Sequence, residues 1–252
     1  MIGSQRLIHS AACFWPAALI VWGPGLAPGR HAHTCVQLSL AITGTLRVRE
    51  RTRSPWRRCR ALVVKANAEH ETDASGSFVL HGFIAAESPL GAAVTTHVHS
   101  DIAIVSTAEA ARWRQTLADP KTLDSGRVKR WISTLMRDGV RPPVDPRVDC
   151  VIQMLQRHAL DTHSTSLAQL SRVAGLSPSR FAHVFTESIG IPLRPYLRWL
   201  RLQRAARELM SGSAVTQAAH VAGFADAAHL TRTFRRTLGA TPRDLIEPAP
   251  RT

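Results

Sequence analysis

The sequence predicts an α+β protein of two domains, with an N-terminal β domain, a helical connector and a C-terminal all-α domain. Short apolar runs between turn residues fill residues 17–105, which is typical of antiparallel strands. Helical patterns follow, and residues 145–246 contain only short amphipathic helices with tight turns. We place the domain boundaries at residues 1–106, 107–143 and 144–252.

Five short runs predict the strands of the first domain. They cover residues 18–22, 36–42, 61–64, 77–80 and 102–105. Residues 36–42 alternate partly between apolar and polar side chains, which predicts a strand with one buried face. Several short strands at this spacing favour a sandwich or a barrel.

The N-terminal stretch and the cysteines bear on the compartment. Residues 7–22 are moderately apolar but interrupted by Pro16, and they are shorter than the roughly 18 apolar residues of a membrane span. We therefore predict a buried strand at residues 17–22, with no signal peptide and no membrane partner. The four cysteines are scattered without a CxxC pair, which favours inert thiols in a reduced compartment. Together these features lead us to expect a cytoplasmic protein.

The connector is predicted to hold two helices. Thr107 is placed to cap a helix that ends near residue 117, and Asp124 or the next residue can cap a second helix through Arg137. Two prolines in residues 141–144 then indicate a linker. The connector is also the candidate segment for homodimer formation.

Two segments of the C-terminal domain repeat each other, at residues 166–190 and 214–239. The matched positions, 48 or 49 residues apart, are Gln169 with Gln217, Val173-Ala174-Gly175 with Val221-Ala222-Gly223, Phe185 with Phe234, and Gly190 with Gly239. A period of this length that occurs only twice indicates a duplicated module.

Each copy has the pattern of a helix-turn-helix unit. A short helix ends at a glycine, and Ser177 or Asp226 then caps a second helix. Helical spacing puts apolar residues of each second helix on one face and leaves the other for base edges and phosphates. A generic helical hairpin is the alternative, but it leaves the matched positions unexplained.

Between the copies, residues 193–210 predict one helix of about 27 Å, long enough to set two reading helices about one DNA turn apart. One of its faces carries a row of arginines: Arg198, Arg201, Arg204 and Arg207. This row is either a solvated helix face or a set of phosphate contacts, and the sequence leaves both open.

The second copy contains a characteristic string, AHVAGFADAAHLTRTFRRTLGATP, at residues 219–242. Matching residues elsewhere in the domain are Phe181, Phe185, Gly190, Tyr196, Arg201, Leu202 and Ala205. Residues 145–246 thereby resemble the DNA-binding domain of the AraC/XylS family of transcription regulators. The resemblance implies a seven-helix domain that reads double-stranded DNA through two recognition helices, often activating transcription beside RNA polymerase.

The exposed faces of the two second helices supply the candidate DNA-reading residues. On the first helix they are Ser179, Arg180, Ala182 and His183, and on the second they are Ala227, Ala228, His229, Thr231 and Arg232. Arg180 and Arg232 are the best candidates for guanine readout, whereas Arg235 and Arg236 are expected to hold the backbone. Ala227 and Ala228 cannot hydrogen-bond to bases, so they either contact thymine methyls or leave that half-site loosely read.

In the first domain, a second resemblance rests on the spacing of Gly25, His31, His33, Gln37 and Gly44, with His70 further along. This spacing resembles the metal-binding motifs of cupins, and Gln37 stands where those motifs have glutamate. The resemblance implies a cupin-like β-barrel that acts as a sensor.

The three histidines can share a divalent metal ion, since His31 and His33 point the same way if they lie on a strand. Glutamine is a weak ligand and cannot act as a general base. The alternative is a barrel in which these polar residues line a small-molecule effector pocket, with Trp22, Trp56 and Phe83 as its apolar wall.

Composition narrows the function classes further. A hydrophobic content of 44% excludes a mainly disordered chain. The formal charge of +14 predicts a polyanionic partner, but it is divided evenly, so charge alone does not locate the DNA-binding face. We expect a non-enzymatic regulator, an activator, controlled by an effector in the N-terminal barrel. The alternatives are a metal-dependent cupin enzyme carrying a DNA-binding domain, and a regulator with a vestigial barrel.

Overall fold

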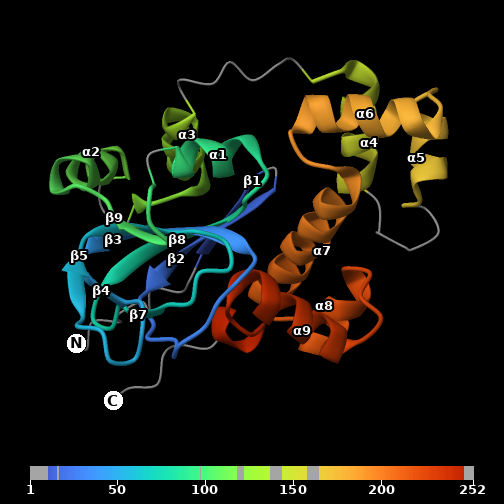
Figure 1. The fold of residues 1–252 in the computed structure, drawn as a ribbon. Helices are drawn as coiled ribbons and strands as arrows, with labels where there is room; N and C mark the ends of the chain where they lie inside the picture. Colours follow the sequence, from blue (N-terminus) through green and yellow to red (C-terminus); the bar gives the residue numbers. More distant parts are fainter. Residues whose placement is uncertain are drawn as a thin grey trace.

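The computed structural model of the chain describes residues 11–15, 17–96, 98–117, 122–136, 144–157 and 165–246. A sheet-rich N-terminal part with antiparallel strands is followed by a helical C-terminal part (Figure 1). In the described ranges, every helix falls short of the length or the apolarity needed to cross a bilayer.

Six antiparallel strands form the main sheet, in the order β1-β2-β8-β3-β6-β9. Their bounds are β1 Ala11–Trp15, β2 Ala18–Pro24, β3 Cys35–Thr43, β6 Ala61–Val64, β8 Phe78–Ala85 and β9 Ile102–Ile104. A smaller sheet has the order β5-β4-β7, with β4 Leu46–Arg49, β5 Arg57–Cys59 and β7 Glu71–Asp73. The five predicted strands are confirmed, as β2, β3, β6, β8 and β9.

The main sheet is covered on both faces. Val36, Leu38 and Leu40 of β3 pack into the hydrophobic cluster that the sheet shares with the helices α2 Thr107–Leu117 and α3 Ser125–Leu135. The alternate residues Gln37 and Ser39 are also buried, on the opposite face. The prediction of one exposed face on this strand was therefore wrong, because the small sheet and the C-terminal helices cover the side expected to meet solvent.

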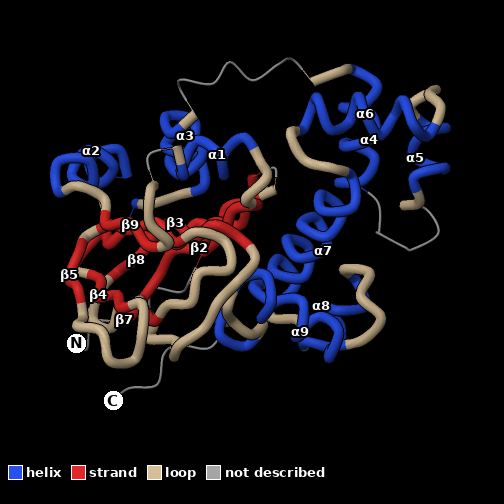
Figure 2. Tube along the Cα trace, viewed as in Figure 1, coloured by secondary structure: helices blue, strands red, loops and turns tan. Residues whose placement is uncertain are grey.

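Three helices lie along one face of the main sheet (Figure 2): α1 Pro89–Thr95, α2 and α3. The predicted cap of α3 is confirmed, since the Asp124 side chain accepts a hydrogen bond from the N–H of Arg127. For α2 the prediction was one residue off: the Ser106 hydroxyl, not that of Thr107, accepts the N–H of Glu109. Arg137 and most of the predicted linker lie outside the described residues.

The C-terminal part consists of helices, as predicted. They are α4 Pro146–Arg157, α5 Leu167–Val173, α6 Pro178–Ile189, α7 Leu193–Met210, α8 Val215–Val221 and α9 Ala227–Leu238, followed by the 3₁₀ turn η2 Arg243–Leu245. The long helix α7 occupies the residues predicted for it. It separates the α5–α6 pair at its start from the α8–α9 pair at its end (Figure 1).

The two parts pack against each other through a shared hydrophobic cluster. Leu19 and Ala85 of the sheet belong to the same cluster as the cores of α6, α7 and α9. Inside this contact, the buried Gln203 of α7 donates hydrogen bonds to the carbonyls of Trp15 and Ala18, at 2.7 and 2.8 Å. This contact was not predicted, and its one signal in the sequence is a glutamine among the apolar residues of the helix.

Candidate nucleic-acid interface and the adjoining histidine cluster

Helices α6 and α9 begin in the same way, as the repeat predicts. Ser177 accepts a hydrogen bond from the N–H of Arg180 at 3.3 Å, and Asp226 accepts one from the N–H of His229 at 2.6 Å. Both caps have extended backbones, which ends the preceding turn and sets the direction of the helix.

The helices also end in the same way. Gly190 and Gly239 follow them in the left-handed region, with φ of +82° and +73°. The turns inside the two helix pairs use Gly175 at φ +64° and Gly223 at φ +77°. These four positions confirm the predicted role of glycine, because a side chain at positive φ is strained.

Buried aromatic and aliphatic side chains determine which face of each helix is exposed. Phe181 and Phe185 are fully buried on α6, and the ring of Phe185 meets that of Tyr196 edge-on at 5.3 Å. Leu230 and Phe234 play the same part on α9. The opposite faces of both helices are thereby turned to solvent.

On α6, Ser179, Arg180 and His183 are exposed, whereas Ala182 is half-buried. His183 Nε2 lies 3.2 Å from a carboxylate oxygen of Glu187, one turn along the helix. Sequence reasoning overlooked Glu187, although its i+4 spacing from His183 was a signal. An acidic side chain here weakens any phosphate contact of His183.

On α9, the exposed candidates are Ala228, Arg232, Arg235 and Arg236. Three other candidates, Ala227, His229 and Thr231, are half-buried and therefore less accessible to DNA. The ring of His229 packs edge-on against Phe224 at 5.3 Å, and the Thr231 hydroxyl donates to a backbone carbonyl within α9 at 2.8 Å. Fewer residues of α9 are therefore available to contact DNA than the sequence predicted, and most of them are arginines.

The three candidate metal-binding histidines come together beside α9. His31 and His33 lie in the loop between β2 and β3 rather than on a strand, and His70 lies just before β7. His31 and His70 exchange backbone hydrogen bonds of 3.0 and 2.9 Å, and their rings are 4.3 Å apart. One side-chain nitrogen from each histidine can be chosen so that all three lie within 4.8 Å of one another.

Hydrogen bonds to the backbone define which nitrogens can bind a ligand. The Nδ1 of His70 donates to the carbonyl of Ala68 at 2.9 Å, and the Nδ1 of His31 donates to that of Gly29 at 2.7 Å. Nδ1 is therefore the donor in each ring, which leaves Nε2 as the nitrogen available to a ligand. In His70, this Nε2 is buried and has no hydrogen-bond partner. Burial also lowers the pKa of His70 to about 3, so the ring is neutral near pH 7.

Gln37 links the cluster to a chain of polar side chains on the inner face of the sheet. His33 Nε2 lies 2.8 Å from Gln37 Oε1, and Gln37 Nε2 donates to Ser39 Oγ at 2.8 Å. Ser39 Oγ in turn lies 2.8 Å from His81 Nδ1 on the neighbouring strand. Sequence reasoning missed Ser39 and His81, because the pairing of β3 with β8 was unknown.

Comparison with known proteins identifies the helical part. A family model described as a helix-turn-helix domain matches residues 170–247. The arabinose operon regulatory protein of Salmonella typhimurium is 30% identical over 114 residues, which are 44% of this chain and 39% of that protein. A putative AraC-like transcription regulator of Streptomyces antibioticus is 36% identical over 102 residues, covering 40% and 33% of the two chains. Residues 170–247 of this chain therefore match a helix-turn-helix domain, and the relatives similar to this chain include AraC-type regulators.

The chain spans at most about two fifths of the length of these relatives. A solved structure of ToxT from Vibrio cholerae aligns with 92% of this chain and 98% of its own, at 8% identity and a TM-score of 0.45.

The arginines along α7 of the helix-turn-helix domain differ in their surroundings. Arg198 is exposed, whereas Arg201 is half-buried and burial lowers its pKa. The guanidinium of Arg207 lies 4.0 Å from the ring centroid of Phe14, on β1. Arg207 is therefore occupied by the N-terminal part, which leaves Arg198 as the freest candidate for a phosphate contact.

The apolar wall predicted for an effector pocket does not form. Trp22 packs on the helix-covered face of the main sheet, whereas Phe83 packs on the opposite face. Trp56 lies outside both clusters, beneath the guanidinium groups of Arg47 and Arg49. The prediction that these three aromatics share a pocket was wrong, because strand alternation separates Trp22 from Phe83.

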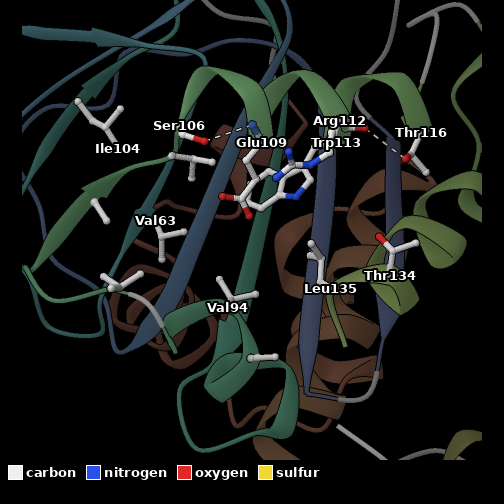
Figure 3. A pocket seen from close by; sticks show the side chains of 14 residues that line it. Val63, Val94, Ile104, Ser106, Glu109, Arg112, Trp113, Thr116, Thr134 and Leu135 are labelled. Carbon is white, nitrogen blue, oxygen red and sulfur yellow. Dashed lines mark hydrogen bonds between the residues drawn. The ribbon is translucent and has the colours of Figure 1, made fainter. Parts of the chain in front are cut away.

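A cavity of about 710 Å³ lies elsewhere, between the helix-covered face of the sheet and helices α1 to α3. Val63, Val94 and Leu135 give it apolar surface, and Glu109, Arg112 and Trp113 project into it from α2 (Figure 3). Sequence reasoning missed it, because it exists only once the helices are packed on the sheet. It is separated from the histidine cluster by the main sheet.

Proposed function

We propose that this chain is a DNA-binding transcriptional regulator, in which α5–α6 and α8–α9 are two helix-turn-helix units. The supporting observation is the duplication itself, since both pairs share the cap, the left-handed glycines and the buried aromatic face. The division that we propose is a cupin-like sensor domain at residues 1–106, a connector at 107–143 and the DNA-binding domain at 144–252.

In this proposal, α6 and α9 enter successive major grooves on one side of the duplex. The 18 residues of α7 correspond to a helix of about 27 Å, comparable with the roughly 34 Å between successive major grooves. The exposed side chains of α6 and α9 then meet base edges, while the flanking arginines meet phosphates.

The two reading helices are unequal in charge. When the repeats are aligned by Phe185 and Phe234, Arg232 corresponds to His183 and Arg236 corresponds to Glu187. We propose that α9 supplies most of the attraction to phosphates, because its exposed face carries three arginines and α6 pairs its histidine with a carboxylate.

For the N-terminal domain, we propose a sensor whose ligand is a divalent transition metal held by His31, His70 and His33, whose Nε2 would exchange its contact with Gln37 for the metal. The supporting observation is the orphaned Nε2 of His70, because a buried nitrogen without a hydrogen-bond partner is satisfied by a metal ion. Gln37 contacts His33 and cannot exchange a proton, which favours a sensor over a cupin enzyme. The metal would supply a cross-link between segments of the domain.

Activation of transcription beside RNA polymerase, and homodimer formation through the connector, are further parts of this proposal. They rest on the resemblance to the family. A small organic effector is the alternative ligand of the sensor, and the cavity beneath α2 has the volume for one.

The test is binding of the full chain to duplexes from the region next to its own gene, measured by fluorescence anisotropy. Arg232→Ala should weaken specific binding by about 1–3 kcal/mol if Arg232 reads a base. The matched control is Arg58→Ala, which removes the same charge from an exposed position on β5. An equal effect of the two substitutions, or no sequence-specific binding at all, would contradict the proposal.

A further inference from the structure

The C-terminal end of the second reading helix rests on the histidine cluster. A Cβ atom added to Gly239, which ends α9, would lie 2.3 Å from His31 Cδ2 and 3.1 Å from His33 Cδ2. Next to this contact, the N–H of Thr34 donates to the carbonyl of Arg236 at 3.0 Å. Two of the three candidate ligands therefore belong to the surface on which α9 is docked.

The same loop lies beside the cationic face of α9. Ala32, between the two histidines, lines a groove of about 320 Å³ together with Thr231, Arg232, Arg235 and Arg236. A change in the conformation of this loop would therefore alter the surroundings of the arginines that we expect to contact DNA.

We propose that the histidine cluster is a metal-dependent latch, in which metal binding by His31, His33 and His70 and docking of α9 on the N-terminal domain stabilise each other. This inference rests on the proposed metal site and adds its regulation. Because the linkage is reciprocal, loss of the metal loosens α9, and loss of the docking contact weakens metal binding by the same factor.

The geometry supplies the physical reason. The loop at residues 25–34 lies outside the sheets, and the paired backbone bonds between His31 and His70 join it to the segment before β7. A metal bound by histidines from both segments would cross-link them and hold the loop in the shape that fits Gly239. The carbonyls that end α9 carry partial negative charge, which also favours a nearby cation.

The repeat provides a matched control for this contact. Gly190 occupies the same place after α6, also at positive φ, but a Cβ there would meet Pro89 at 2.4 Å and no histidine. Gly239→Ala and Gly190→Ala therefore impose the same kind of backbone strain and the same kind of clash with the N-terminal domain. Only the first clash falls on the cluster.

The experiment is titration of the full chain with Zn²⁺ in competition with a chromophoric chelator, repeated for both glycine variants. We expect Gly239→Ala to weaken zinc binding at least tenfold, and Gly190→Ala to change it less than twofold. Equal zinc affinities of the two variants, with strong binding by the unmodified chain, would overturn the latch and leave the metal site standing. No zinc binding by the unmodified chain, or binding that His70→Ala leaves intact, would refute the metal site and the latch with it.

A second measurement covers the case in which Gly239→Ala does not fold. Hydrogen exchange of the Thr34 amide reports the bond to Arg236 directly in the unmodified chain. We expect saturating Zn²⁺ to slow this exchange at least tenfold relative to chelator-treated protein. An unchanged rate, in protein shown to bind zinc, would overturn the latch.

Discussion

At the scale of single residues, His70 combines deep burial with an unpaired polar atom. His70 is fully buried, donates one hydrogen bond from Nδ1 and leaves Nε2 without a partner. In a core of neutral groups such an atom costs free energy, so its retention points to a ligand or a switch at this position.

The burial of His70 predicts acid sensitivity of the metal-free protein. Burial lowers the pKa of His70 from 6.5 to about 3. Between these two pH values, His70 is protonated in the unfolded chain and neutral in the folded chain. The stability of the fold is therefore greatest above pH 6.5 and falls as the pH drops from 6.5 towards 3. One such group contributes about 1.4 kcal/mol per pH unit to this slope.

The measurement is urea unfolding between pH 7.5 and 4.5 in the presence of a chelator. His70→Phe, which keeps a ring of similar size, should reduce the slope by about one proton. If the unmodified chain and the variant lose stability in parallel, His70 is not the titrating group.

The candidate DNA-reading residues show what sequence can and cannot predict at this scale. Helical spacing correctly placed Arg180 and Arg232 on exposed faces, because the buried aromatics of each copy fix the rotation of the helix. The engagement of His229 by Phe224 was not predictable, since it depends on the angle at which α8 and α9 meet.

At the scale of elements, the two reading helices begin with equivalent N-caps. The carboxylate of Asp226 and the hydroxyl of Ser177 each accept the N–H of the third residue of a reading helix, one of the N–H groups that its first turn leaves free. A cap fixes the start of the helix, and the N-terminal turns of α6 and α9 are the turns that carry Arg180 and Ala228.

We expect Asp226→Ala to destabilise the protein by about 1 kcal/mol and to weaken DNA binding, because the first turn of α9 frays. Asp226→Asn should retain most of the stability, since asparagine is as good a cap. Thermal unfolding and DNA titration of the two variants check this. Equal losses for both substitutions would show that the charge of Asp226, rather than its cap, is what matters.

Elements were predicted from sequence where periodicity or caps were strong. The helices from α2 to α9 and five strands were found, whereas α1 and β1 were missed, as were the small-sheet strands β4, β5 and β7. Those strands are three or four residues long and rich in charged side chains. They form because they pair with one another, and local sequence preference does not reveal such pairing.

At the scale of the whole molecule, the N-terminal part touches both reading helices at equivalent points. Gly190 after α6 meets Pro89, and Gly239 after α9 meets His31 and His33. Between these points, α7 is attached to the β1–β2 hairpin by Gln203. The two reading helices and the helix between them are thus in contact with the domain that we propose as the sensor, so a change there can alter their relative placement.

The contact made by Gln203 predicts how the two parts are coupled. Gln203→Ala removes the side-chain donor from the half-buried carbonyl of Trp15 and the buried carbonyl of Ala18, which should cost about 1–3 kcal/mol. We expect this loss to appear as separation of the parts, with an earlier unfolding transition and faster proteolysis between them. The control is Gln217→Ala on α8, which removes an exposed glutamine of the same domain. Should both variants melt in one transition at the same temperature as the unmodified chain, Gln203 does not hold the parts together, and the other contacts between them, above all the shared hydrophobic cluster, must do so.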